Sequence, residues 1–261
     1  MRLATWNVNS VRAREGLVAD WLERERPDLL LLQETKCEAH AFPAERFAAL
    51  GYASEVVGQK SYNGVAVLAR VPVTVTARAL PGCEDQARYI EVDAESIRVG
   101  NLYLPNGNSG GEDGYAYKLR FMDALRARAE TLLADDVPLV LAGDYNVAPA
   151  DDDFFPGTLG PDDALRRPES RAAFRRLLWL GLTDAVRALH PTQRIWTFWD
   201  YQSGAWPQDR GLRIDHALLS AELADHLVSA TPDRMERDRP QPSDHVPVVV
   251  EIAWPTPTAP A

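Results

Sequence analysis

The chain has 261 residues, of which 46% are hydrophobic and 25% charged, and this composition is typical of a globular protein of one large or two small domains. Its two cysteines, Cys37 and Cys83, are too few for a zinc site built from cysteines, and no apolar run approaches the length of a membrane span. The formal net charge of −10 argues against a protein that coats nucleic acid through bulk positive charge, although a local basic rim stays possible.

The first predicted elements are a strand, a helix and a strand. RLATWNV alternates as a strand does, and Ser10 is a suitable N-cap for a helix that Pro27 ends. DLLLLQET is continuously apolar, which is typical of a strand covered on both faces. Because the chain enters this pattern without the apolar region of a signal peptide, we expect a cytoplasmic protein with reduced thiols.

The rest of the chain repeats this alternation. Short strand patterns separated by turns over residues 63–104 predict an antiparallel meander. A helix near residues 117–134 and the strand VPLVLAGDYN follow, then a helix over residues 171–190 and the strands TFWDY, RIDHALLS and VPVVVEI. No interior linker or repeat divides the chain, so we expect one domain over residues 1–254 and a disordered, Pro-rich tail over residues 255–261.

Oxygen-bearing side chains gather where the predicted strands begin or end. They are Asn7, Glu34, Asp144, Asn146, Asp215 and Asp244. Carboxylate and amide oxygens are the ligands of hard cations such as Mg²⁺ or Mn²⁺. Any one of these side chains is more often a turn-forming residue, so the prediction of a metal site depends on their joint occurrence.

Seven motifs carry a family resemblance: TWNVNSVRA, LLQETK, NLYLPNG, GDYNVAP, TFWDY, RGLRIDH and PSDHVPV. Their order resembles that of the exonuclease III family of apurinic/apyrimidinic endonucleases, within the endonuclease/exonuclease/phosphatase superfamily, and the resemblance covers residues 2–252. It implies a four-layer α/β sandwich in which two facing mixed β-sheets are covered by helices. It also implies a monomeric Mg²⁺-dependent hydrolase, with Mn²⁺ as a substitute, that cuts double-stranded DNA 5′ to abasic sites and removes 3′ blocking groups and nucleotides.

The resemblance assigns roles to the strand-end residues. Glu34 resembles the principal metal ligand, with Asn7 beside it, and Asp244 resembles a ligand of a second or alternative metal position. Asp144 resembles the group that positions or deprotonates the attacking water, and Asn146 resembles a donor to the phosphate; both also belong to the implied metal site. The number of metal ions and the identity of the general base stay open.

His245 needs a partner to hold its ring. Neighbours in an extended strand point to opposite faces, so Asp244 is poorly placed for this and Asp215, on another strand, is the expected partner. Such a carboxylate favours the imidazolium and leaves the other ring nitrogen free to donate to a phosphate oxygen. His216 is expected to face away and to be structural. Tyr103 fits a core tyrosine equally well, but the resemblance places its hydroxyl toward the phosphate.

Further residues resemble contacts to DNA. Arg88 and Asn106 resemble residues that hold the DNA backbone near the lesion. Lys118 and three arginines are expected to add positive charge at the rim of the site. These arginines are Arg120, Arg210 and Arg213.

Aromatic side chains near RGLRIDH fit either a core or a wall that stacks on DNA. We expect at least one of Phe198, Trp199 and Trp206 to lie in the core. The resemblance places Phe198 and Leu212 in a pocket for an extruded abasic sugar.

Two other functions are compatible with such a fold. A phosphodiesterase acting on lipid or inositol phosphates would be expected to carry an apolar, membrane-seeking loop, which this sequence lacks. An inactive binding module would be expected to lack Glu34, Asp144 or His245, and all three are present. The balance between endonuclease and exonuclease activity is left open.

Overall fold

The strands of residues 1–254, the part of the chain that the computed structural model describes, form two sheets of six strands each. The first sheet contains β1 (Arg2–Asn7), β2 (Leu29–Gln33), β3 (Ala53–Val57), β4 (Val65–Ala69), β11 (Leu227–Pro232) and β12 (Val248–Ile252). The second contains β5 (Val73–Ala77), β6 (Tyr89–Ala94), β7 (Ile97–Tyr103), β8 (Leu139–Asp144), β9 (Thr183–Asp184) and β10 (Asp215–Leu219). The α-helices are α1 (Glu15–Glu25), α2 (Ala44–Ala48), α3 (Gly111–Ala134), α4 (Pro168–Leu178), α5 (Ala185–Leu189) and α6 (Ala221–Ala224). Short 3-10 helices are η1 (Ala39–Ala41), η2 (Asp151–Asp153) and η3 (Arg234–Asp238).

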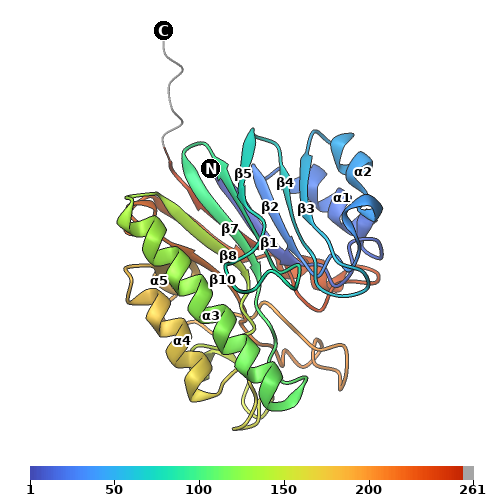
Figure 1. Cartoon of the computed structure of the whole chain (residues 1–261). Coiled ribbons are helices and arrows are strands. Elements are labelled where there is room, and N and C mark those ends of the chain that lie inside the picture. Colours follow the sequence, from blue (N-terminus) through green and yellow to red (C-terminus); the bar gives the residue numbers. More distant parts are fainter. Residues whose placement is uncertain (255–261) are drawn as a thin grey trace.

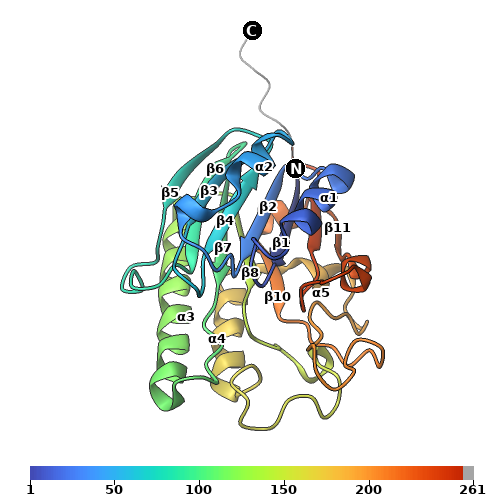
Figure 2. The same ribbon diagram turned by 90° about the vertical axis from the view of Figure 1, so that its right-hand side faces the viewer.

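The two sheets face each other and helices cover their outer faces, which confirms the predicted four-layer α/β sandwich (Figure 1). The strand orders are β11-β12-β1-β2-β4-β3 and β5-β6-β7-β8-β10-β9. Helices α1 and α2 pack on the first sheet, and α3 and α4 lie side by side on the second (Figure 2). β1 pairs with β2 and β7 with β8 in parallel, with α1 and α3 as the crossover helices. The carboxyl ends of these four strands therefore meet at one edge of the sandwich.

The position of strand β2 between two packed layers explains why its sequence is continuously apolar. Leu29 and Leu31 point into the core between the two sheets, whereas Leu30 and Leu32 pack in the cluster that contains α1 and α2. Both faces of the strand are thus buried, as its sequence predicts.

A buried polar bridge joins the two sheets just below the edge where β2 ends. The amide of Gln33 on β2 donates to Asn101 Oδ1 on β7 at 2.8 Å and to Thr5 Oγ1 on β1 at 2.9 Å. Asn101 in turn donates to the carbonyl oxygens of Leu32 and Ala66 in the first sheet. Directional bonds between buried amides fix the relative position of the sheets, which a purely apolar contact would leave freer.

The structure corrects three predicted helix boundaries. Ser10 is not an N-cap: its φ is 90°, residues 11–14 form turns, and α1 begins at Glu15. Helix α3 begins at Gly111 instead of near residue 117. The helix predicted over residues 171–190 is interrupted, because Gly181 adopts a φ of 97° after α4 and the short strand β9 precedes α5.

The structure also corrects the predicted strands. The meander over residues 63–104 is divided, since β4 pairs with β2 and β3 in the first sheet whereas β5, β6 and β7 form an antiparallel set in the second. TFWDY forms only isolated bridges at Phe198, and the half-exposed strands β3 and β11 were not predicted. The tail predicted to be disordered, residues 255–261, lies outside the described residues. Among residues 1–254, no helix has the length and apolar character needed to cross a bilayer.

Helix α3 is tied to the second sheet by the buried carboxylate of Glu91. Arg128 on α3 donates to it at 2.7 Å, Arg98 on β7 at 2.8 Å, and the hydroxyls of Tyr89 and Thr76 at 2.8 and 2.7 Å. Burial alone would raise the pKa of Glu91, but these donors lower it from 4.5 to about 2. The carboxylate is therefore charged at every pH at which the protein is expected to work.

Replacing Arg128 with Met should lower the free energy of unfolding at pH 7 by about 2 kcal/mol, because a buried carboxylate loses a charged donor. The pKa of Glu91 is depressed in the folded state, so its contribution is fully present above pH 4.5 and is lost as pH falls toward 2. The difference between R128M and wild type in urea denaturation should therefore shrink below pH 4.5. The matched control is R126M on the exposed face of α3, where the ion pair with Glu130 should contribute less than about 0.5 kcal/mol. Equal effects of the two substitutions would contradict the role of Glu91.

Candidate active site

The predicted site residues converge at the edge where β1, β2, β7 and β8 end. Asn7, the last residue of β1, donates from its side-chain nitrogen to Glu34 Oε1 at 2.8 Å and to Asp144 Oδ2 at 3.0 Å. Glu34 follows β2 of the first sheet and Asp144 ends β8 of the second, so this amide joins carboxylates from both sheets. Asp215 on β10 lies directly opposite Asp144 in the antiparallel pairing of these strands.

Two of these residues have an unusual backbone conformation. Glu34 has a φ of 50° and Asn146 a φ of 48°, in the left-handed region that costs a non-glycine residue roughly 1–2 kcal/mol. The turn at Glu34 is held because its carbonyl accepts from the amide of Ser10 at 2.7 Å and the amide of Thr35 donates to Gly64 at 3.1 Å. Only glycine fits position 64, since its φ is 91° and a Cβ there would lie 2.1 Å from Thr35 Oγ1.

His245 and Asp215 form the pair that strand alternation predicts. The Nδ1 atom of His245 lies 2.8 Å from Asp215 Oδ2 and 3.1 Å from Oδ1, and its Nε2 lies 3.8 Å from Asp144 Oδ2. Burial would lower the pKa of His245, but the negative charges of Asp215 and Asp144 raise it to about 10. At neutral pH the ring is therefore an imidazolium with both nitrogens protonated. The edge of the Phe198 ring packs against it, with ring centroids 4.9 Å apart.

The pKa values of Asp144 and Glu34 are shifted in opposite directions. Burial raises its pKa to about 7 and the charge of Asp215 adds to this effect, while His245 and the amide of Asn7 act against it. For Glu34 burial also opposes ionisation, but Lys36 and Asn7 lower its pKa below the ordinary value. The Lys36 ammonium lies 2.9 Å from Glu34 Oε2 and also donates to Asn9 Oδ1.

The donor set fits a hard divalent cation. Glu34 and Asp144 offer carboxylate oxygens, which Mg²⁺ and Mn²⁺ prefer, whereas Asn7 turns its amide nitrogen to both carboxylates and would supply an oxygen only after its amide rotates. Burial, with the charge of Asp215 adding to it, disfavours ionisation of Asp144, and a bound cation would favour its charged form. Asp144, Asp215 and His245 also bring one ligand atom each to within 4.8 Å of one another, but a protonated ring offers no lone pair to a metal.

Asp244 lies beside this set and connects to it through Asn9. Its Oδ1 accepts from Asn9 Nδ2 and from Ser243 Oγ, both at 3.3 Å, and the main-chain amide of Asn9 donates to Asn7 Oδ1 at 3.0 Å. Asn9 and Lys36 were not predicted as site residues. Both nevertheless lie inside the motifs TWNVNSVRA and LLQETK, next to residues that were.

Asn146 and Asn106 hold Asp144 and each other. The main-chain amide of Asn146 donates to Asp144 Oδ1 at 2.9 Å, and its side-chain nitrogen donates to Leu104 O at 2.9 Å and to Asp144 Oδ2 at 3.3 Å. Asn106 Nδ2 donates to Asn146 Oδ1 at 2.9 Å. The donation to a phosphate that the resemblance implies for Asn146 would have to replace its longer bond to Asp144.

The rim positions predicted for two basic residues, Lys118 and Arg213, are wrong. Lys118 is fully buried, and its ammonium donates to the carbonyl oxygens of Asn106 and Asn146 at 3.0 and 2.6 Å, so it cannot reach a DNA phosphate. Burial lowers the pKa of Lys118 to about 7. Arg213 is 1% exposed and pairs with Asp153 and Asp184, both at 2.7 Å.

His216 faces away from the site, as predicted. Its ring is fully buried, with Nδ1 3.0 Å from an Arg213 nitrogen and Nε2 2.9 Å from the carbonyl oxygen of Val147. Burial lowers its pKa to about 4, with Arg213 adding to the shift, so the ring is neutral at pH 7.

Tyr103 ends β7 opposite Asp144 in the parallel pairing. Burial raises its pKa well above the ordinary value, and the charges of Glu34 and Asp144 raise it further, so the hydroxyl keeps its proton. The Arg88 guanidinium stacks 4.6 Å above the Tyr103 ring and donates to Tyr103 O at 3.1 Å.

A pocket of about 300 Å³ lies beside His245 and is lined in part by Phe198 and Leu212. Arg210, Asp200 and Leu159 also line it. Trp199 is fully buried and its ring packs edge-on against Trp206, with centroids 4.8 Å apart. The prediction that at least one of the aromatic residues lies in the core is therefore confirmed.

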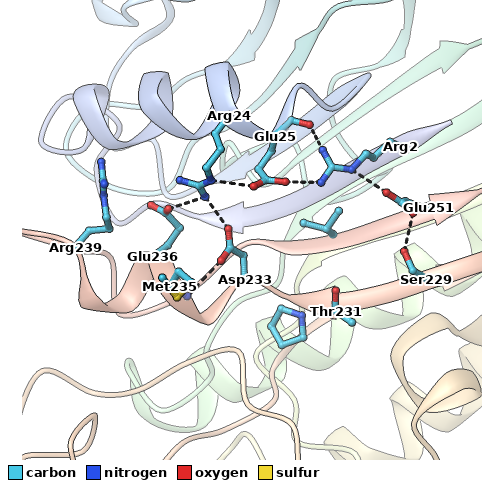
Figure 3. A pocket seen from close by; sticks show the side chains of 12 residues that line it. Arg2, Arg24, Glu25, Ser229, Thr231, Asp233, Met235, Glu236, Arg239 and Glu251 are labelled. Carbon is cyan, nitrogen blue, oxygen red and sulfur yellow. Dashed lines mark hydrogen bonds and ion pairs between the residues drawn. The ribbon is translucent and has the colours of Figure 1, made fainter.

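A hollow of about 470 Å³ opens on the first sheet, at the opposite end of β1 from Asn7, between α1, β11 and η3. Two of its basic groups are paired with carboxylates in Figure 3: Arg2 bonds to Glu251 at 3.0 Å, and Arg24 bonds to Asp233 and Glu236 at 2.8 and 2.9 Å. The third, Arg239, pairs with Asp20 at 2.6 Å. None of the predicted site residues lines this hollow.

The fold and the site define a class of phosphate-ester hydrolases, and comparison with known proteins agrees. The sequence profile of the Endonuclease/Exonuclease/phosphatase family matches residues 4–245, and the chain belongs to this family. Exodeoxyribonuclease III of Haemophilus influenzae is 35% identical over 266 residues, which cover 97% of this chain and 100% of that protein.

Two solved structures narrow the class further. An AP endonuclease from Archaeoglobus fulgidus superposes with a TM-score of 0.91 at 34% identity, covering 97% of this chain and 100% of that one. A 3′ phosphatase from Neisseria bound to a product DNA hairpin gives a TM-score of 0.91 at 36% identity, with the same coverage. The protein is thus a DNA repair nuclease of the exonuclease III and AP endonuclease type.

Replacing Asp215 with Asn should lower the pKa of His245 from about 10, because a neutral amide no longer stabilises the imidazolium. Nuclease activity should fall by about tenfold to a hundredfold, as when a transition-state donor is weakened. The pKa of His245 is measured by NMR titration of the imidazole nitrogens, and the rate of cleavage is measured on a DNA duplex. The control is D225N, an exposed position outside the site. A His245 pKa that does not change in D215N would show that the pair is not electrostatically coupled.

Proposed function

We propose that the protein hydrolyses the phosphodiester on the 5′ side of abasic sites in double-stranded DNA, with Mg²⁺ or Mn²⁺ as cofactor, and leaves a 3′-hydroxyl. We also propose removal of 3′ blocking groups and of nucleotides from 3′ ends. One observation carries this proposal: a buried imidazolium, an aspartate with a pKa of about 7 and a carboxylate–amide ligand set share one crevice. Residues 1–254 form the catalytic domain in this proposal, because both sheets supply site residues.

Glu34 and Asn7 would hold the principal metal ion, with Asp144 and Asn146 beside them and Asp244 at a second or alternative position. When bound, the cation would draw charge from a phosphate oxygen and stabilise the leaving 3′-oxygen. Lys36, which now neutralises Glu34, would have to move away from its carboxylate.

The protein's own residues take the proton from the attacking water and stabilise the phosphate, and the leaving 3′-oxygen takes its proton from solvent water. Asp144 accepts a proton from the attacking water, because its buried carboxylate lies beside both His245 and the proposed metal ligands. His245 donates from Nε2 to a nonbridging phosphate oxygen, and Asp215 keeps the ring charged and oriented. Tyr103, held protonated, donates a hydrogen bond from its hydroxyl to the phosphate.

Substrate selection is proposed for the pocket lined by Phe198 and Leu212. An abasic nucleotide has no base to unstack, so it is extruded at lower cost than an intact nucleotide, for which a few kcal/mol is typical. Arg88 and Asn106 line a second hollow together with Tyr103, and there they would contact the DNA backbone. The cytoplasmic location and the monomeric state stay predictions.

A fluorescent duplex with one abasic analogue should be cut 5′ to the analogue in Mg²⁺ or Mn²⁺ and left intact in EDTA, because the proposed ligands are hard oxygen donors. Gel electrophoresis against markers resolves the 3′-hydroxyl product. Full cleavage in EDTA would rule out the metal, and equal cleavage of intact duplex would rule out abasic specificity.

Two substitutions separate the proposed roles in the same assay. Glu34→Ala should raise the metal concentration required for half-maximal rate, whereas His245→Ala should lower the rate by roughly 10²–10³ fold at saturating metal. The same metal requirement in both variants would contradict this division.

Replacing Phe198 with Ala should reduce the preference for abasic over intact duplex more than it reduces cleavage itself, because a larger pocket admits a base. The comparison variant is L212A, which enlarges the same pocket without removing the ring packed on His245. The ratio of kcat/KM for abasic and intact duplex is the measurement, and a ratio unchanged in both variants would show that these side chains are core residues only.

A further inference from the structure

Lys118 is a titratable side chain inside the protein whose hydrogen-bond acceptors are main-chain carbonyls instead of a carboxylate. It projects from α3 and is fully buried. Its ammonium donates to Asn106 O at 3.0 Å and to Asn146 O at 2.6 Å. These carbonyls belong to the two loops that follow β7 and β8, which carry Tyr103 and Asp144 at their starts.

Burying an ammonium is unfavourable, and an apolar side chain of similar length would fill the same space without that cost. The packing around Lys118 is also close: a Cβ at Gly107 would lie 2.7 Å from Lys118 Cδ, and Gly107 has a φ of 87°. The carbonyl oxygens of Asn106 and Asn146 lie in irregular loops, where no neighbouring strand of the described chain donates a hydrogen bond to them. They therefore need another donor. A single ammonium with three donors meets this need for both loops together.

The loops joined by Lys118 determine the position of Asn146. Its side chain accepts from Asn106 Nδ2 at 2.9 Å and donates to Leu104 O and Asp144 Oδ2. Its φ of 48° is a conformation that the chain keeps only when its surroundings hold it. Without a bond between the two loops, the Asn146 amide would lose a fixed direction relative to Asp144.

We propose that Lys118 is a positioning residue for phosphodiester hydrolysis, which acts by fixing the side chain of Asn146 against Asp144 and never contacts DNA. This inference rests on the proposed roles of Asn146 and Asp144 in that reaction. The sequence suggested that Lys118 adds positive charge at the rim of the site. In this proposal Lys118 instead acts from beneath the site.

A double-mutant cycle on cleavage of the abasic duplex tests the proposal. K118M removes the ammonium while keeping an unbranched side chain of similar length, and N146A removes the side chain on which Lys118 is proposed to act. We expect K118M to lower kcat by about tenfold to a hundredfold with KM for DNA unchanged within about threefold, because binding groups at the surface are untouched. In the N146A background, K118M should cause less than about a threefold further loss, because the two residues act as one unit.

A purely structural role gives a different result. If Lys118 only stabilises the fold, its effect multiplies with that of N146A, and such multiplicative losses would overturn the proposal. So would a K118M variant that raises KM steeply with kcat unchanged, since this is the result expected of a DNA contact. The control on the same helix is R126M, on the exposed face of α3, which should keep wild-type kinetics. Thermal denaturation of each variant sets an assay temperature at which all are folded.

Should K118M not fold, the cycle is run with K118Q, whose shorter amide keeps a donor for one of the two carbonyls. Intermediate loss of kcat and the same absence of further loss in N146A are then expected, and multiplicative losses again overturn the proposal. Failure of the proposed substrate is distinguishable, because wild type would then leave the abasic duplex uncut. The cycle is in that case run on a duplex with recessed 3′ ends.

Discussion

The structure depends on one electrostatic constraint: two buried carboxylates, Asp144 and Asp215, and a partly buried one, Glu34, share one crevice. They repel one another where water screens them poorly, so each requires a nearby positive charge or donor. His245 and Lys36 are the two cations placed against them. Burial raises the pKa of Asp144, whose nearest cation is 3.8 Å away, whereas the Lys36 ammonium in contact with Glu34 lowers the pKa of that carboxyl despite burial.

The sandwich architecture supplies that crevice. Each sheet contributes a parallel strand pair, and the Asn7 amide bonds to carboxylates that follow one strand of each sheet. The buried contact of Gln33 with Asn101 fixes the sheets just below, so small shifts between them would be opposed by directional bonds as well as by packing. Hence the site is not a property of one motif but of the registration of two layers.

Sequence reasoning succeeded where local pattern determines the outcome. The apolar run of β2, the strand-end position of Glu34 and the pairing of Asp215 with His245 all follow from the period of a strand. It failed where no motif identifies the partner: the rim position of Arg213 was wrong because its buried partners, Asp153 on η2 and Asp184 on β9, belong to none of the recognised motifs. Short strands likewise carry no signal for which sheet they join, so the division of the meander between two sheets was not predictable.

Lys36 has a consequence for ion selectivity. Without metal, the Glu34 carboxylate already carries a neutralising unit charge in contact with it. A monovalent ion that displaced this ammonium would leave the local charge unchanged and would still lose its hydration shell, so exchange offers it no electrostatic gain. A divalent ion adds one net positive charge to a crevice with an excess of negative charge. A site arranged in this way would favour a divalent ion over sodium or potassium by valence, because the competing cation is a side chain of the protein itself.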